Sequence, residues 1–397
     1  MTKAWTPMLT PFIRMNRWVS ILIFSVGVPC FFYTTGLQAA EPALRDKISQ
    51  MLLIGFDGFR VSKDAWIVKA MDRYPLGGVI LFDYNQKTKT YRRNIASPAQ
   101  TRALNHQLQQ WTSFYNHKHH RADVPLIISI DYEGGLVNRL KDTQGFPKTL
   151  SQAQVGRLSD LEITHHARAM ARTLRDLQFN VNFSPVLDVN VYQDNPIIGH
   201  VQRSFSPNAE KVAHDGKIYT ENYLAEGIQC AYKHFPGHGS SHADSHLGFV
   251  DVTTTWSSKE LIPYQRLLSL PHPCGMIMSA HLVNRQLDPS GLPATLSHRV
   301  LTDLLRQHLH FKGVVVTDDL QMKAISTQYD LKQVLTLAIN AGADLLVFGN
   351  QLVDRPQEPG ELIDLIEHQV KTGHITRQRI DEAYHRIVHF KTQLAYF

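Results

Sequence analysis

The chain has 397 residues, of which 43% are hydrophobic, enough for one large buried core. Its 41 lysine and arginine residues outnumber its 35 aspartate and glutamate residues, but three of these bases lie in the first 40 residues, which contain no acid. The rest of the chain is close to charge balance and has no basic cluster, which excludes a nucleic-acid-binding protein.

The first 40 residues have the pattern of an export signal. Arg14 and Arg17 precede an apolar stretch over residues 18–33, and small and polar residues follow it up to position 40. A positive start, an apolar middle and a small-residue end are typical of a secretory signal peptide. We therefore expect an exported protein, periplasmic or extracellular, with residues 41–397 as its mature domain. The alternative is an uncleaved membrane anchor, because the apolar stretch is long for a signal.

Beyond this leader the chain contains two cysteines, Cys230 and Cys274. An oxidising compartment permits a disulfide between them, but their spacing does not decide whether they are joined. Cysteines near the starts of apolar strands are more often buried thiols. We therefore expect two free, buried thiols.

Eight short apolar runs, rich in β-branched residues, alternate with segments of helical length. Several runs are continuously hydrophobic, as expected of parallel strands covered on both faces. Helix-start signals lie between them: Ser97 with Pro98 begins one helix, and Ser257 with Glu260 has the spacing of a capping box. No repeat or low-complexity linker interrupts the pattern, so we expect a single domain. The runs cover residues 51–56, 78–82, 126–130, 181–189, 227–232, 275–279, 314–317 and 345–348.

Polar residues follow these runs all round the predicted sheet. A strand–helix pair repeated eight times forms either a closed barrel or an open, doubly wound sheet. An open sheet gathers its functional groups at one switch point, whereas a barrel gathers them at the carboxyl ends of its strands. The pattern therefore predicts an α/β fold of the (β/α)8 TIM-barrel class. The polar residues at the strand ends are Asp131, Glu133, Asp188, Asn190, Lys233, His234, His281, Asp318, Asp319 and Asn350.

The segment after the fifth run combines cations, histidines and helix-breaking residues. Lys233 and His234 are expected to point into the barrel mouth, where they can hydrogen-bond hydroxyl groups. Proline and glycine at positions 236–239 prevent a helix and make a loop able to reach across the site. Asp244 and His246 lie two residues apart on this loop, so the carboxylate can orient an imidazole whose ordinary pKa of about 6.5 suits proton transfer.

A metal site is an alternative for this segment, because it has a histidine at every fourth position. That spacing aligns ligands on a helix, but the proline and glycines break any helix here. A metal-dependent barrel hydrolase also usually carries a His-x-His on its first strand, and residues 51–56 have none. We therefore expect no metal site. The four histidines are His234, His238, His242 and His246, of which the middle two can also be ordinary surface residues.

Two acids, Asp318 and Asp319, follow the seventh run. A carboxylate at the end of a buried barrel strand lies over the barrel centre, where in glycoside chemistry it can attack an anomeric carbon if a proton donor stands about 5 Å away. Asp319 has the position of a helix N-cap, because a helix is expected to begin near Leu320. We therefore predict catalysis by Asp318 and capping by Asp319.

Motifs along the whole mature chain resemble those of family 3 β-N-acetylhexosaminidases, which are glycoside hydrolases. They occur in the family's order, and the resemblance spans residues 45–390. The β-glucosidases of the family generally add a second domain that supplies a glutamate acid, whereas this chain has an Asp-Ser-His loop. The matching residues are Ile130-Asp131-Tyr132-Glu133-Gly134-Gly135 with Arg139, Arg203-Ser204-Phe205, Lys233-His234-Phe235-Pro236-Gly237-His238-Gly239 with Asp244-Ser245-His246, and Thr317-Asp318-Asp319-Leu320-Gln321-Met322.

The resemblance implies a retaining glycosidase that uses neither a metal nor an organic cofactor. By this likeness Asp318 is the nucleophile and His246 the general acid/base, assisted by Asp244. The partner is then a carbohydrate with a terminal, non-reducing β-linked N-acetylglucosamine, from an oligosaccharide or a peptidoglycan fragment. The residues that the resemblance places around this sugar are Asp131, Arg139, Arg203, Lys233 and His234.

Two other functions are compatible with these motifs: a family 3 hydrolase for another β-linked sugar, such as glucose or xylose, and a barrel that binds carbohydrate without catalysis. The second is disfavoured, because a binding protein has no need of a nucleophile and an acid together. Leu136 and Asn138 stand where the family often has arginine and glutamine, which leaves preferences beyond the terminal sugar open. A neutral base beside an anionic nucleophile also admits phosphate instead of water as the acceptor.

Overall fold

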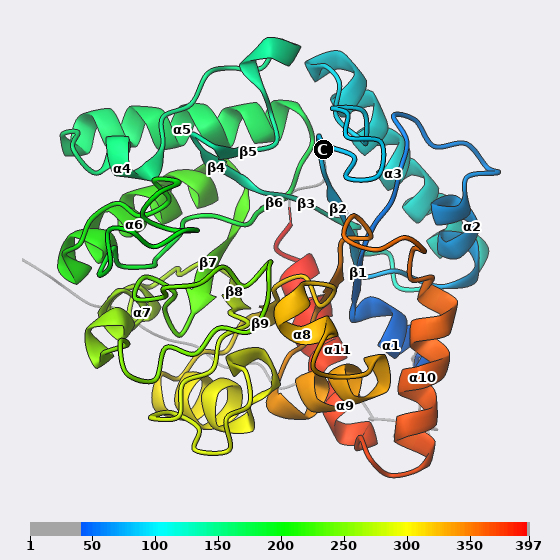
Figure 1. Ribbon diagram of the computed structural model, residues 1–397. Helices are drawn as coiled ribbons and strands as arrows, with labels where there is room; N and C mark the ends of the chain where they lie inside the picture. Colours follow the sequence, from blue (N-terminus) through cyan, green and yellow to red (C-terminus); the bar gives the residue numbers. More distant parts are fainter. Residues whose placement is uncertain (1–40, 395–397) are drawn as a thin grey trace, which may run out of the picture. The chain divides into compact units, whose positions relative to one another are not determined.

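A computed structural model describes residues 41–394, and the predicted leader, residues 1–40, lies outside this range. Within the described residues, eight parallel strands form a barrel in the order β10-β1-β2-β3-β6-β7-β8-β9 (Figure 1). Each predicted run coincides or overlaps with one strand, so the predicted barrel is confirmed. The strands are β1 (Leu52–Gly55), β2 (Gly78–Leu81), β3 (Ile127–Ile130), β6 (Val181–Asn182), β7 (Gln229–Phe235), β8 (Met276–Ser279), β9 (Val314–Thr317) and β10 (Leu346–Phe348).

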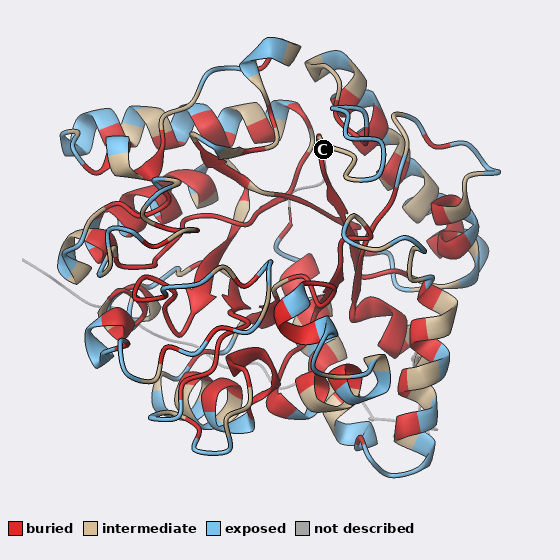
Figure 2. Ribbon diagram, viewed as in Figure 1, coloured by how far each residue is buried: buried red, intermediate tan, exposed pale blue. Residues whose placement is uncertain are grey.

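The sheet closes between β9 and β10. Val316 and Leu345 form one parallel bridge there, and the Thr317 N–H donates to the carbonyl of Leu345 at 2.9 Å. All eight strands are buried along nearly their whole length, and helices lie outside them (Figure 2). Their apolar side chains belong to one buried core cluster. This is why the strands have continuous apolar runs instead of alternating ones.

Helices surround the barrel and expose mainly their outer faces (Figure 2). The Ser97 hydroxyl accepts a hydrogen bond from the Gln100 N–H at 3.3 Å, which confirms the predicted helix start. Among residues 41–394 no helix is both long and apolar enough to span a bilayer. The helices are α1 (Leu44–Gln50), α2 (Trp66–Arg73), α3 (Pro98–Lys118), α4 (Gln152–Val155), α5 (Asp160–Asp176), α6 (Ala209–Ala225), α7 (Ile262–Leu268), a π-helix (Arg299–His308), α8 (Lys323–Ser326), α9 (Leu331–Ala341), α10 (Pro359–Lys371) and α11 (Arg377–Lys391).

The fourth strand is shorter than its apolar run, and a hairpin follows the third. Pairing in β6 ends at Asn182, before Pro185, a residue that has no N–H to donate to a sheet. The chain continues in extended form, and Val186 bridges Lys233 of β7. The hairpin pairs β4 (Tyr132–Gly134) with β5 (Val137–Asn138), and the Asn182 amide donates to the Tyr132 carbonyl at 2.9 Å.

The predicted capping box at Ser257 is wrong. Ser257 precedes a short 3-10 helix (Ser258–Leu261) but makes no side-chain capping bond to it. Glu260 is instead fully buried, and its Oε2 accepts the N–H of Gly239 at 2.9 Å. A tertiary contact to the loop after β7 has therefore replaced a local one.

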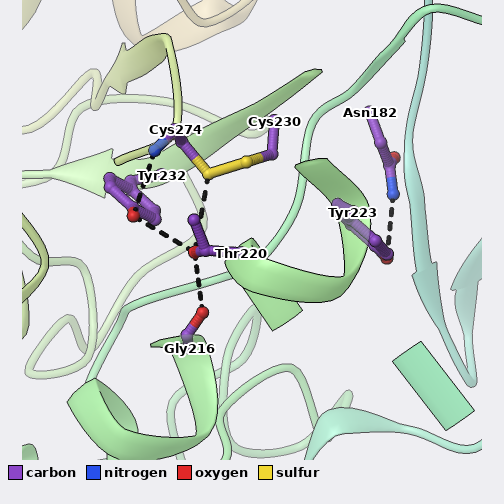
Figure 3. The surroundings of a disulfide bond; sticks show 7 residues. All are labelled: Asn182, Gly216, Thr220, Tyr223, Cys230, Tyr232 and Cys274. Carbon is purple, nitrogen blue, oxygen red and sulfur yellow. Dashed lines mark hydrogen bonds between the residues drawn. A yellow bond between two sulfur atoms is a disulfide. The ribbon is translucent and has the colours of Figure 1, made fainter. Parts of the chain in front are cut away.

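The expectation of two free thiols is also wrong, because Cys230 and Cys274 form a disulfide (Figure 3). Cys230 lies in β7 and Cys274 just precedes β8, and these strands are hydrogen-bonded neighbours with Ala231 opposite Met276. The pairing brings the two Cα atoms to 4.9 Å, a separation that a disulfide can span. The Cys274 N–H donates to the Tyr232 hydroxyl at 3.1 Å, so the bridge lies within a hydrogen-bonded cluster at the start of both strands (Figure 3).

Candidate active site

A cavity lies at the centre of the barrel, beyond the carboxyl ends of the strands. Phe82, Phe183 and Met278 form part of its apolar wall. Its polar residues come from the connections that follow β3, β7, β9 and β10, four segments far apart in the sequence. These residues are Asp131, Arg139, His246, Asp318, Asp319 and Gln351.

Asp318 is the first residue after β9. Its N–H donates to the carbonyl of Ser279 in β8 at 3.2 Å, which ties the backbone at this point to the neighbouring strand. Its Oδ1 accepts the N–H of Asp319 at 2.8 Å. Burial raises the pKa of Asp318, but the histidines His281, His234 and His246 and the N–H of Asp319 together hold that pKa below its usual value. Asp318 is therefore an ionised carboxylate at neutral pH, facing the cavity.

His246 and Asp244 form a hydrogen-bonded pair on the loop after β7. Asp244 Oδ1 lies 2.8 Å from His246 Nδ1 and also accepts the backbone N–H of His246 at 2.8 Å. Burial lowers the pKa of the imidazole, but the bond to Asp244 and the charge of Asp318 outweigh it and raise the pKa above its ordinary value. With Nδ1 engaged by Asp244, the other ring nitrogen is available for proton transfer at the cavity.

A buried network of ion pairs lies behind Asp131. The Lys233 ammonium lies 2.9 Å from Asp131 Oδ1 and 2.6 Å from Glu133 Oε1. Arg203 donates to both oxygens of Glu133, at 2.8 Å and 2.7 Å. Burial alone would raise the pKa of Asp131 and Glu133, but the neighbouring cations hold both pKa values below the usual range. The network therefore keeps two carboxylates and two cations charged away from water.

His234 is held in one tautomer. Its Nδ1 lies 2.6 Å from Asp188 Oδ2, and its Nε2 lies 3.1 Å from Nη2 of Arg203. A guanidinium only donates hydrogen bonds, so Nε2 accepts and the proton is on Nδ1, which donates to Asp188. Burial and the charges of Arg203 and Lys233 hold the pKa of His234 well below its usual value. The ring is therefore neutral.

The sequence model of the glycosyl hydrolase family 3 N-terminal domain matches residues 43–390. The chain belongs to glycosyl hydrolase family 3. The "Beta-hexosaminidase A" of Pseudoalteromonas piscicida is 32% identical to it over 346 residues, which cover 82% of this chain and 54% of that protein. The "Beta-hexosaminidase" of Bordetella pertussis (strain Tohama I) is 32% identical over 339 residues, which cover 83% of this chain and 86% of that protein.

A solved structure of a family 3 β-N-acetylglucosaminidase from Paenibacillus sp. str. FPU-7 matches this fold with a TM-score of 0.78 and 33% sequence identity. The match covers 89% of this chain and 63% of that one. The family 3 chain described here thus spans about half the length of the Pseudoalteromonas protein and less than two thirds of the Paenibacillus chain.

The five residues predicted to surround the sugar fall into two groups in this family 3 barrel. Asp131 and Arg139 line the cavity, and Nη2 of Arg139 lies 3.6 Å from Asp131 Oδ2. Arg203, Lys233 and His234 are buried behind them, each at most 8% exposed. The Lys233 ammonium contacts two carboxylates, one of which, Asp131, lines the cavity. The role of these residues in binding the sugar stays a prediction.

Glu133 and Asp188 join the site although the sequence assigned them no role. Both were recognisable as polar residues at strand ends, and Glu133 also as part of the family motif over residues 130–135. Glu133 neutralises Arg203 and Lys233, and Asp188 orients His234. An acid at a strand end, close to predicted cations of the same barrel mouth, was the sequence feature that could have indicated an ion pair.

Asp319 does not cap a helix at Leu320, contrary to prediction. The helix α8 begins at Lys323, with Met322 as its N-cap residue. Asp319 Oδ1 instead accepts the N–H of Gln321 at 3.0 Å within a turn. Burial raises the pKa of Asp319 to about 7. The two adjacent acids therefore differ in pKa, because the surroundings of Asp318 stabilise its anion and burial of Asp319 favours its protonated form.

Each of the four regularly spaced histidines has a side-chain partner of its own, although the rings of His234 and His238 also meet edge to face with centroids 6.1 Å apart. His234 pairs with Asp188, and His246 pairs with Asp244. The ring of His242 stacks on Tyr192, with centroids 3.9 Å apart, and Nε2 of His238 lies 3.3 Å from the Ser245 hydroxyl. Across residues 41–394, no three histidine, cysteine or acidic side chains converge in a way that could hold a metal ion.

Proposed function

We propose that this family 3 chain is a retaining β-N-acetylhexosaminidase that removes a terminal, non-reducing β-linked N-acetylglucosamine. One observation carries the proposal: the Asp318 carboxylate and the Asp244-bonded imidazole of His246 line the same cavity at the barrel mouth. A nucleophile and a proton donor near one anomeric carbon are what retaining hydrolysis requires. The names of the Pseudoalteromonas, Bordetella and Paenibacillus proteins support the choice of sugar.

In the first step a carboxylate oxygen of Asp318 attacks C1 of the sugar, and the bond from C1 to the leaving oxygen breaks. The proton on the free ring nitrogen of His246 passes to that oxygen, so the aglycone departs as a neutral alcohol. A glycosyl ester with Asp318 remains. Asp244 stabilises the imidazolium before the transfer and keeps the ring turned towards the cavity.

In the second step the now neutral His246 takes a proton from a water molecule, whose oxygen attacks C1. The ester bond between C1 and Asp318 breaks, which restores the carboxylate and the imidazolium. Two displacements at C1 leave the β configuration unchanged. Asp131 and Arg139 offer an acceptor and donors to the sugar hydroxyls. The buried network of Arg203, Lys233 and His234 supports them.

The test is the variant Asp318→Ala, assayed on an aryl N-acetyl-β-glucosaminide. The expected loss in kcat is of the order of 10³-fold or more, with an unchanged circular dichroism spectrum. A slow 5-fluoro analogue of the sugar should leave a glycosyl adduct on the peptide that contains Asp318, detected by mass spectrometry. Near-normal turnover by the variant, or an adduct on another residue, would show that the nucleophile is assigned wrongly.

The same assay identifies the sugar and the acceptor. Aryl β-glucoside and β-xyloside should be much poorer substrates than the 2-acetamido sugar, and activity should be unchanged by a chelator. A strong preference for glucose or xylose would contradict the proposed specificity. Added inorganic phosphate should not divert product to the sugar 1-phosphate, which would identify a phosphorylase.

We infer that the protein is exported. The basic and apolar leader supports this, and so does the buried disulfide between Cys230 and Cys274, because disulfides persist in oxidising compartments. Cell fractionation with N-terminal sequencing should recover a soluble protein cleaved near residue 40. Uncleaved protein in the membrane fraction would indicate an anchor, and cytoplasmic protein with two free thiols would overturn the inference.

A further inference from the structure

We propose that Ser245 is a positioning residue, which fixes the imidazole of His246 at the cavity by tying the loop to His238 and to helix α8. The inference rests on the proposed role of His246 as proton donor and deepens it. It concerns the loop over residues 236–247, called here the acid/base loop.

Ser245 is the buried centre of an exposed segment. It is 2% exposed, whereas the side chains of Asp244 and His246 on either side are 24% and 49% exposed. Leu247, the next residue, is 74% exposed. Asp244 and His246 bind each other, so their mutual bond sets the geometry of the pair but does not place it over the cavity. Ser245 makes the contacts that can place it.

Two hydrogen bonds connect Ser245 to the rest of the barrel. Its hydroxyl lies 3.3 Å from Nε2 of His238, near the start of the same loop. Its carbonyl accepts the N–H of Ala324 at 3.2 Å. Ala324 belongs to α8, which follows Asp318 after a short turn. One residue thus links the loop that carries the acid to the segment that carries the nucleophile.

His238 is a rigid partner for this hydroxyl. It is 2% exposed, its N–H donates to Asp188 Oδ1 at 2.8 Å, and its carbonyl accepts a hydrogen bond from the Asn195 amide at 2.8 Å. Asp188 also accepts hydrogen bonds from His234, so the same carboxylate orients a residue of the buried network and the base of the acid/base loop.

The next residue, Gly239, fixes the loop from two further sides. Its N–H donates to the buried Glu260 at 2.9 Å, and its carbonyl accepts the N–H of Tyr192 at 3.2 Å. A Cβ atom at this position would lie 1.6 Å from the carbonyl oxygen of Val189, so only glycine allows the approach. The base of the loop is therefore immobilised. The contact of Ser245 with His238 holds the neighbouring His246 in a fixed position relative to this base.

The energetic argument concerns proton transfer. General acid catalysis requires the donor within hydrogen-bond reach of the leaving oxygen, and a displacement of about 1 Å can cost about 10²-fold in rate. Loss of the Ser245 hydroxyl leaves both catalytic groups in the protein but loosens the position of one. The expected defect is therefore in protonation of the leaving group and not in attack by Asp318.

The experiment compares leaving groups. Ser245→Ala should lower kcat/KM by about 10- to 100-fold for a phenyl glycoside of N-acetylglucosamine, whose phenolate needs a proton to depart. For the 2,4-dinitrophenyl glycoside, which departs without one, the loss should be less than about 3-fold. His246→Gln provides the reference: its kcat/KM should fall further for the phenyl glycoside and again much less for the 2,4-dinitrophenyl glycoside. His238→Asn should resemble Ser245→Ala, and the double variant should lose little more than either single variant.

Ser297→Ala is the matched control. It also removes a buried serine hydroxyl, which donates to Asp288 at 2.6 Å in the connection after β8, and should affect both leaving groups equally and slightly. If Ser245→Ala lowers both rates equally, or neither, while His246→Gln remains selective, the positioning role is wrong and the proposed function stands. If His246→Gln itself shows no selectivity, the proposed proton donor is wrong and the inference about Ser245 falls with it.

Discussion

Arg203 and Glu133 form a bidentate ion pair, with two N–H donors 2.8 Å and 2.7 Å from the two carboxylate oxygens. Their side chains are 9% and 1% exposed. Such fork-to-fork pairing is among the strongest hydrogen-bonded geometries available to side chains. Because Lys233 also lies 2.6 Å from Glu133, one carboxylate contacts two buried cations, and Asp131 supplies the second negative charge.

Glu133→Gln should therefore destabilise the protein by about 3 kcal/mol, since it leaves buried cations without their counter-charge. Urea denaturation measures the loss in free energy of unfolding. KM for the aryl substrate should also rise, because the network would no longer hold Asp131 in one position. The control is Glu210→Gln, which breaks the exposed pair with Arg266. It should have a much smaller effect, because solvent screens an exposed ion pair. Equal effects of the two variants would contradict a special role for the buried pair.

Asp244→Asn should shift the pH profile of kcat/KM. The donor must be protonated, so activity falls as pH rises through the pKa of His246. In the wild type the bond to Asp244 and the charge of Asp318 raise this pKa above its ordinary value, against the effect of burial. Removing the Asp244 charge lowers it, and the alkaline limb should move to lower pH. An alkaline limb that stays in place would indicate that another group donates the proton.

The double variant Cys230→Ala/Cys274→Ala should be less stable than the wild type by about 2–4 kcal/mol, the usual range for a lost native disulfide. The bridge closes a 44-residue separation that includes α7. Thermal unfolding with and without reductant measures the effect. Reductant should lower the melting temperature of the wild type and leave that of the variant unchanged. A wild type insensitive to reductant, even after unfolding and refolding in its presence, would contradict this expectation.

Lys391→Met should raise stability at pH 6. Lys391 is 1% exposed on α11, its ammonium donates to the Leu76 carbonyl at 3.3 Å, and burial lowers its pKa to about 7. The unfolded chain keeps a pKa of about 10.5. Below pH 7 the folded state therefore carries the full penalty of a buried charge, and the penalty decreases as pH rises from 7 towards 10.

Urea denaturation at pH 6 and pH 9 checks this. The Lys391→Met variant should gain more than about 1 kcal/mol over the wild type at pH 6, since one pKa unit corresponds to about 1.4 kcal/mol, and less at pH 9. The exposed Lys332→Met on α9 serves as control and should change little at either pH. A gain of the same size at both pH values would mean that packing, and not charge burial, is responsible.

Much of the barrel could be predicted because each strand is a short run of apolar residues that is visible in the local sequence. The residues of β9 are valine and threonine alone, and Asp318 follows them at once, so strand, end and candidate nucleophile are all visible in a few residues. The loop pair Asp244 and His246 could be predicted for the same reason, since their contact is local in sequence.

What depended on distant contacts could not be predicted. The disulfide follows from the register of β7 against β8, which no spacing reveals. Glu260 has the spacing of a capping box with Ser257, but its carboxylate accepts the buried N–H of Gly239, 21 residues earlier. Lys233 was expected just after the fifth strand but lies within β7, and its burial follows from contact with Glu133, a residue 100 positions earlier.

The closure of the barrel between β9 and β10 bears on how this protein is made. Asp318 lies two residues beyond Val316, the residue that bridges Leu345, and the Leu320 N–H donates to the carbonyl of Val347 at 3.0 Å. The wall beside the candidate nucleophile therefore comes from β10, the barrel strand that follows all the others in chain order. A nascent chain arrested before β10 holds every catalytic candidate yet lacks the neighbour that shapes their cavity, so activity should arise only after β10 has been synthesised.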